Sequence, residues 1–106
     1  MTDEQTDACA AVCLACAEAC ERCADACASA ARRVDCRERC IDCAELCRLS
    51  VSFLSRRSSF ASQLFQQCAR TCASCAALCS QNDSALCRAC VDACHACIRE
   101  CRRAAA

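Results

Sequence analysis

The sequence predicts an all-α fold: an antiparallel up-down-up-down four-helix bundle with a cysteine-lined core. Three observations lead to this prediction. The chain contains no glycine and no proline, the residues that most often interrupt a helix. Its 19 cysteines recur at alternating spacings of four and three residues, which is the period of one helix face. Short polar segments divide these cysteines into four groups, one for each predicted helix.

Each group of cysteines forms one stripe along its helix. At about 100° per residue, the cysteines of the first group stay within an arc of about 80°. They occupy heptad positions where a bundle normally carries leucine, isoleucine and valine, so cysteine replaces the usual core. The four groups are Cys9, Cys13, Cys16, Cys20, Cys23 and Cys27; Cys36, Cys40, Cys43 and Cys47; Cys68, Cys72, Cys75 and Cys79; and Cys87, Cys90, Cys94, Cys97 and Cys101.

Polar breaks set the helix boundaries within what we expect to be a single domain, residues 1–106. The segments 56–59 (Arg-Arg-Ser-Ser) and 80–83 (Ser-Gln-Asn-Asp) have the composition of turns. Connections this short force consecutive helices to run antiparallel. The predicted helices span residues 3–31, 35–56, 59–80 and 83–103.

Two helix starts carry capping signals. Thr2 and Gln5 have the spacing of a capping box, in which each side chain accepts a hydrogen bond from the backbone of the other. Asp35 and Glu38 have the same spacing and predict an N-cap and its partner three residues later.

The two ends of the predicted bundle differ. Toward the connection between the second and third helices the stripes continue without cysteine, which predicts an apolar plug of Val51, Leu54, Ala61, Leu64 and Phe65. At about 1.5 Å per residue, three cysteines should lie level with this plug: Cys9, Cys13 and Cys101. Four others should ring the opposite end and form the mouth of the core: Cys27, Cys36, Cys79 and Cys87.

Composition argues against several classes of protein. Thirteen arginines balance thirteen acidic residues without a basic block, so we expect no nucleic-acid partner. No uncharged run approaches the roughly 20 residues of a membrane span, so we expect no membrane association. Residues 1–5 are polar and carry no export signal, which predicts a cytoplasmic protein. The cytoplasm is reducing and keeps cysteines as thiols that can bind metals.

The cysteine spacing favours storage of Cu(I). Side chains three or four residues apart on a helix have Cβ atoms about 5–6 Å apart, so two thiolates can share one ion. Cu(I) is soft and accepts few ligands. If each thiolate bridges two copper ions, the core holds about one Cu(I) per sulfur and is nearly neutral, which limits the cost of burying charge. Zinc held by four thiolates would leave a charge of about −2 at each site.

Other interpretations of the cysteines remain open at this point. They are a zinc or other soft-metal thiolate store, a disulfide-stapled helical scaffold, and an iron–sulfur or thiol-redox role. Disulfides across a bundle are disfavoured because helix axes about 8–10 Å apart hold most Cα atoms beyond the roughly 7 Å that a disulfide allows. With one histidine and no phosphate-binding loop, the sequence does not predict an enzyme.

The run from Cys9 to Cys27, together with its shorter versions in the other helices, resembles the bacterial four-helix-bundle copper-storage proteins, in particular the cytosolic branch. The resemblance covers about residues 9–101. It implies a bundle that binds multiple Cu(I) ions in chains and clusters on all nineteen cysteines. It also implies a homo-oligomer, specifically a tetramer. A copper chaperone or a chelator is a further candidate partner, with which the protein would exchange the metal.

His95 is a candidate auxiliary copper ligand, because members of the resembled family can use histidine or methionine near a bundle end. It lies about 120° from the centre of its cysteine stripe, so the geometry favours an outward-facing side chain at the surface or at a subunit contact. The only methionine is Met1.

Overall fold

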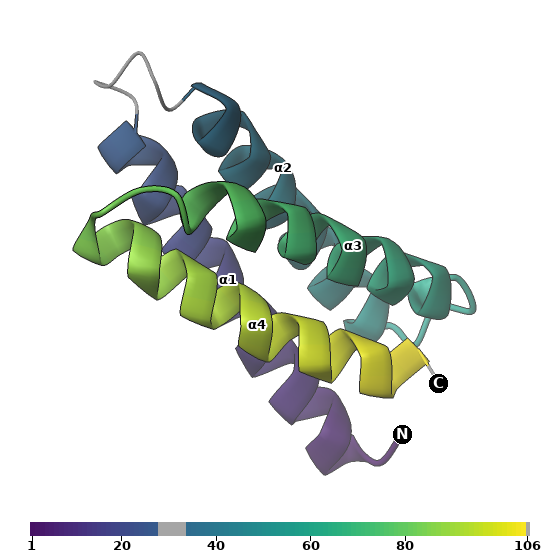
Figure 1. The fold of residues 1–106 in the computed structure, drawn as a ribbon. Helices are drawn as coiled ribbons and strands as arrows, with labels where there is room; N and C mark the ends of the chain where they lie inside the picture. Colours follow the sequence, from purple (N-terminus) through teal and green to yellow (C-terminus); the bar gives the residue numbers. More distant parts are fainter. Residues whose placement is uncertain (28–33, 106) are drawn as a thin grey trace.

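The computed structural model describes residues 1–27 and 34–105, and all of its regular structure is helical. These residues form four helices, which run alternately up and down the molecule as predicted (Figure 1). The predicted residues 28–31 at the end of the first helix lie outside the described residues. The helices are α1 (Asp3–Cys27), α2 (Val34–Ser55), α3 (Ala61–Cys79) and α4 (Ala85–Ala105).

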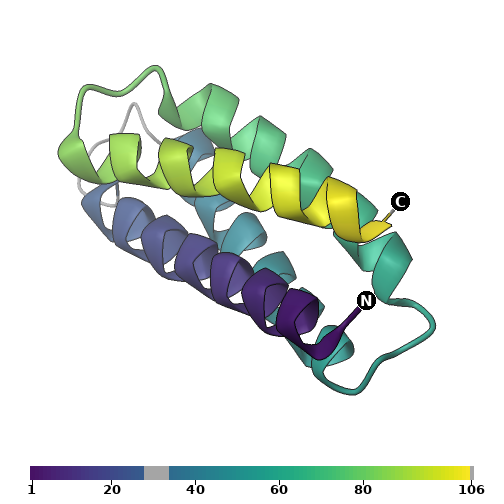
Figure 2. The ribbon, with the colours of Figure 1, turned by 90° about the horizontal axis from the view of Figure 1, so that it is seen from below.

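The helices form a square bundle of 42 × 19 × 18 Å. Helix α1 packs against α2 and α4, and α3 packs against the same two helices. Both chain termini lie at the same end as the connection between α2 and α3, whereas the connection between α3 and α4 lies at the other end (Figure 2). Among the described helices, none combines the length and apolar character needed to cross a bilayer.

The capping box at the start of α1 is confirmed. The backbone N–H of Thr2 donates to Oε1 of Gln5 at 2.8 Å, and the backbone N–H of Gln5 donates to Oγ1 of Thr2 at 3.1 Å. These two bonds satisfy donors that a helix start would otherwise leave unpaired.

The predicted starts of the other helices were early or late by one or two residues. Asp35 is not an N-cap, because α2 begins at Val34 and Asp35 lies in its first turn. Its carboxylate still faces the positive end of the helix dipole. Helix α3 begins at Ala61, because Ser58 first forms a turn that accepts the N–H groups of Phe60 and Ala61. Helix α4 begins at Ala85, and the Asp83 carboxylate before it binds the Arg88 guanidinium at 2.8 Å.

The end of α2 forms a Schellman motif without glycine. The backbone N–H of Ser58 donates to the carbonyl of Phe53 and that of Arg57 to Leu54, both at 3.0 Å. Arg57 takes the left-handed conformation, with φ at 52°, which glycine usually adopts at this position. Its guanidinium pairs with the carboxylate of Asp3 and ties this connection to the start of α1.

Candidate metal centre

All nineteen cysteines lie in the core as free thiols. Seventeen have no exposed surface, and the remaining two are Cys27, 1% exposed, and Cys36, 4% exposed. Each helix brings one face of the chain inward, so the alternating spacing of three and four places every cysteine on that face. The sequence-predicted ligand set is therefore brought together in one volume.

The facing stripes of α2 and α3 match residue by residue. In both stripes the successive cysteines are four, three and four residues apart, a pattern that is the same in either direction. Because the two helices are antiparallel, each cysteine of α2 therefore faces one cysteine of α3. The Sγ–Sγ distances along this seam are 2.8 Å for Cys36–Cys79, 3.7 Å for Cys40–Cys75, 3.4 Å for Cys43–Cys72 and 3.7 Å for Cys47–Cys68.

Sulfur atoms also meet across the diagonals of the bundle. The Sγ atoms of Cys16 on α1 and Cys72 on α3 lie 4.0 Å apart, and those of Cys40 on α2 and Cys90 on α4 lie 3.9 Å apart. Cys23 and Cys87 close the seam between α1 and α4 at 3.3 Å. The centre of the bundle is consequently filled with sulfur from all four helices.

The register along the helices divides the core into four layers with one cysteine from every helix. Numbered from the end that holds the α3–α4 connection, they are Cys27, Cys36, Cys79 and Cys87; Cys23, Cys40, Cys75 and Cys90; Cys20, Cys43, Cys72 and Cys94; and Cys16, Cys47, Cys68 and Cys97. The α1 cysteines also contact the adjacent layer, as Cys23 does with Cys87 at 3.3 Å. The next layer by the same register contains Cys13, Ser50, Phe65 and Cys101. The last contains Cys9, Leu54 and Ala61.

Neighbouring groups of cysteines share their members. Several sets of four have all Sγ atoms within 4.8 Å of one another, close enough to hold a metal ion. Cys16 and Cys43 belong to two of these sets, and Cys20 and Cys94 likewise join two. Because a sulfur atom is shared between adjacent sets, the core is a continuous array and not a row of independent four-ligand sites.

A copper storage protein family model matches residues 2–106. The chain belongs to this family. No curated protein sequence matches it significantly.

Solved structures of copper storage proteins share the fold. The apo form of copper storage protein 3 from Bacillus subtilis is 32% identical, with a TM-score of 0.90 over 95% of this chain and 99% of that chain. The Cu(I)-bound copper storage protein BsCsp3 is 31% identical, with a TM-score of 0.90 over 96% and 99% of the two chains. A cytosolic copper storage protein from Streptomyces lividans with five coppers is 33% identical, with a TM-score of 0.91 over 96% and 92%.

Electrostatics keeps many thiols of this copper storage protein protonated in the absence of metal. Burial, aided by hydrogen bonding with Cys36, raises the pKa of Cys27 to about 12. Burial also raises the pKa of Cys23. In contrast, hydrogen bonding with Cys101 and Cys13 lowers the pKa of Cys97 to about 6. A thiol surrounded by protonated neighbours can thus ionise while those neighbours stay neutral, which limits the buried charge.

The apolar plug is confirmed at its centre. Phe65 is 2% exposed, and Leu54 and Ala61 are buried beside it. Val51 and Leu64 are only half-buried, although Val51 still packs against the core. The inward residue at that level of α2 is Ser50, which continues the cysteine stripe three residues after Cys47. The spacing of Ser50 from Cys47 marks this position in the sequence, whereas apolar character alone selects Val51.

The opposite end of the array matches the predicted ring of Cys27, Cys36, Cys79 and Cys87. The Sγ atom of Cys27 lies 3.5 Å from that of Cys36 and 4.0 Å from that of Cys87. The two cysteines with any exposed surface, Cys27 and Cys36, both belong to this layer. Solvent therefore reaches the sulfur array here before it reaches any other layer.

His95 lies on the exposed side of α4, as its angle to the stripe predicts. It lines a shallow groove between α3 and α4 with Ala73, Ala77 and Ile98. Its proposed role as an auxiliary copper ligand stays a prediction.

Proposed function

We propose that this chain stores Cu(I) in the cytoplasm and holds about one ion per cysteine on its 19 core thiolates. The observation that carries the proposal is the continuous sulfur array, in which adjacent sets of four cysteines share members. A shared thiolate can bridge two monovalent ions, which is the arrangement that brings the core close to neutrality.

Zinc fits this array less well. Independent tetrahedral sites need four thiolates each, whereas Cys16, Cys20 and Cys43 are each divided between two sets. Filling separate sets would leave some cysteines without metal and would stack negative sites in one narrow core.

Copper binding is sequestration without turnover. Thiols that are protonated in the apo bundle lose their protons as copper binds, and the thiolates take the metal from buffering ligands, a chaperone or a chelator. We infer that copper passes through the layer of Cys27 and Cys36, because Phe65 and Leu54 fill the other end and the Arg57–Asp3 pair lies over it.

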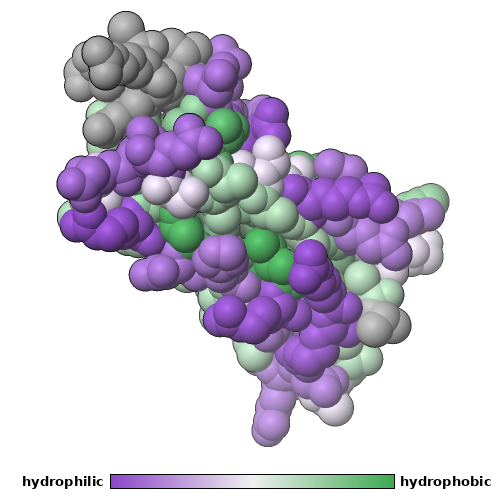
Figure 3. Space-filling view, in the orientation of Figure 1, coloured by the Kyte–Doolittle hydropathy of each residue, from purple (hydrophilic) through white to green (hydrophobic). Residues whose placement is uncertain are grey.

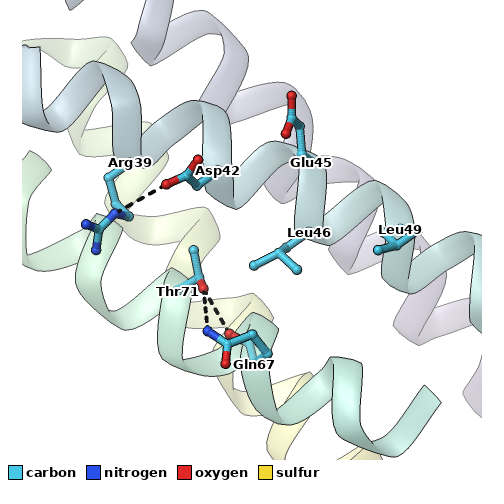
Figure 4. A pocket seen from close by; sticks show the side chains of 7 residues that line it. All are labelled: Arg39, Asp42, Glu45, Leu46, Leu49, Gln67 and Thr71. Atoms are coloured by element: carbon cyan, nitrogen blue, oxygen red, sulfur yellow. Dashed lines mark hydrogen bonds and ion pairs between the residues drawn. The ribbon is translucent and has the colours of Figure 1, made fainter. Parts of the chain in front are cut away.

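We also propose that the chain assembles with copies of itself, as a tetramer. Large apolar side chains stand exposed, including Leu14, Leu49 and Phe60. Figure 3 shows pale apolar areas between charged ones on one face of the bundle. Leu46 and Leu49 line a groove between α2 and α3 (Figure 4). Light scattering of the purified apo protein tests the assembly, and a monomer at every concentration contradicts it.

Anaerobic titration with Cu(I) against a chromophoric chelator tests the storage function. We expect saturation near 19 equivalents per chain, one for each cysteine. Replacement of Cys16 by alanine should lower the capacity by about one equivalent, because every sulfur contributes to the array. Saturation at only a few ions would instead indicate a discrete site. A low count of free thiols in freshly purified, unreduced protein would favour the disulfide scaffold.

A further inference from the structure

Ser50 occupies a cysteine position of the core. It follows Cys47 by three residues on the inward face of α2 and is 1% exposed. The register that pairs Cys16 with Cys47 and Cys47 with Cys68 places Ser50 level with Cys13 on α1 and with Phe65 on α3. Ser50 is thus the polar member of the first layer beyond the four complete cysteine layers.

The hydroxyl of Ser50 has no hydrogen-bond partner in the described part of the chain, although its Oγ is fully buried. The other buried hydroxyl among residues 1–27 and 34–105 is satisfied, because Thr71 Oγ1 donates to the carbonyl of Gln67 at 3.0 Å and accepts from the Gln67 side-chain amide at 3.3 Å (Figure 4). A serine within a helix can donate to the carbonyl four residues earlier in the same way, but Ser50 does not. An unpartnered buried hydroxyl lowers the free energy of unfolding. This cost is offset if the metal-loaded state supplies a hydrogen-bond acceptor for the Ser50 hydroxyl.

A thiolate is the acceptor that this layer can offer. Cys13 and Cys101 share the layer, and both contact Cys97 of the complete layer beside it, at Sγ–Sγ distances of 3.9 and 3.7 Å. A protonated thiol is a weak acceptor, whereas a thiolate that has lost its proton to metal binding is a strong one. Cys13 and Cys101 have the complete sulfur layers on one side and only Cys9 beyond them on the other, so they bridge fewer copper ions and retain more negative charge.

We propose that the Ser50 hydroxyl donates a hydrogen bond to a copper-bound thiolate of Cys13 or Cys101 and thereby strengthens copper binding at the closed end of the array. The inference rests on the copper storage proposed above. Ser50 acts through the cysteines and not as a ligand, because a hydroxyl oxygen is a hard donor that Cu(I) binds poorly.

Replacement of Ser50 by alanine tests this role through copper affinity and stability together. In anaerobic chelator competition at high loading, we expect one or two copper ions of S50A to bind about tenfold more weakly, the effect of losing one charge-assisted hydrogen bond. Apo S50A should be as stable as the wild type or more so, because the variant removes an unsatisfied hydroxyl. Copper loading should raise the melting temperature of S50A by less than it raises that of the wild type.

The matched control is Thr71→Val, which removes a buried hydroxyl outside the cysteine stripes and should leave every copper affinity unchanged. S50A is also combined with C13A and C101A, where its effect on affinity should vanish. Equal copper affinities of S50A and wild type would overturn the inference, and so would a loss that persists without Cys13 and Cys101. Failure of the wild type to bind copper near its cysteine number would instead refute the storage function itself.

Discussion

The Sγ atoms of Cys36 and Cys79 lie 2.8 Å apart, the closest of the sulfur contacts between the described residues of the core. They join α2 to α3 in the layer at the mouth, where Cys36 is also the most exposed cysteine of the chain. Cys79 itself has no exposed surface, so Cys36 is the member of this pair that solvent reaches.

Mild oxidation of the apo protein should therefore join Cys36 and Cys79 before it joins any pair deeper in the bundle. A disulfide forms when the oxidant can reach one thiol and a second sulfur lies close enough to react with it. Peptide mapping during a brief exposure to air provides the measurement. The internal comparison is Cys43–Cys72, which spans the same two helices at 3.4 Å but has no exposed surface. Earlier oxidation of that buried pair would contradict the prediction.

Alkaline pH should destabilise the apo bundle more than the copper-loaded one. The folded-state pKa of Cys27 is about 12, above its ordinary value of 9.0, and that of Cys23 is raised as well. Below pH 9 both folded and unfolded states keep these protons, and the contribution to stability is complete. As pH rises from 9 to 12 the unfolded state loses its protons first, so stability falls across this window.

Chemical denaturation at a series of pH values checks this expectation. The denaturant concentration at the unfolding midpoint of the apo protein should decline from about pH 9 upward, and this decline should be smaller for Cys27→Ala. The loaded protein should show little change, because its thiols are already deprotonated. A flat apo profile up to pH 12 would show that burial does not hold these protons.

The layers of the core could be predicted from the sequence because they follow from spacing alone. Stripes that step by three and four on antiparallel helices must meet in register, and Cys36 with Cys79 fixes that register for α2 and α3. The role of Ser50 could not be predicted in the same way, because it depends on which residues of other helices share its level and on a missing hydrogen bond. The exact helix starts depend on turns such as that of Ser58, where several local hydrogen-bond patterns compete.

Truncation of Phe65 should destabilise the apo protein strongly. Its ring is 2% exposed and is the largest fully buried side chain of the described core. Phe65→Ala should lower the free energy of unfolding by about 3–5 kcal/mol, through lost burial and the cavity that remains. Denaturant titration of the apo form measures the loss. Phe60→Ala is the control, because Phe60 is 63% exposed and its truncation should change stability by about 0.5 kcal/mol or less. Equal losses in the two variants would show that Phe65 does not support the closed end.

The two ends of the array should differ in how fast they admit copper. Cys36→Ala removes a sulfur at the mouth, and Cys9→Ala removes one from the last layer, beyond Phe65 and level with Leu54. Both variants lose one thiol, so their copper capacities should fall equally. Only Cys36→Ala should slow uptake from a Cu(I)–chelator complex, because an incoming ion must first exchange its ligands with an accessible thiolate. Stopped-flow measurement of chelator release follows the rate, and the copper content at equilibrium confirms that the capacities match. Slower uptake by Cys9→Ala than by Cys36→Ala would place the mouth at the opposite end of the bundle.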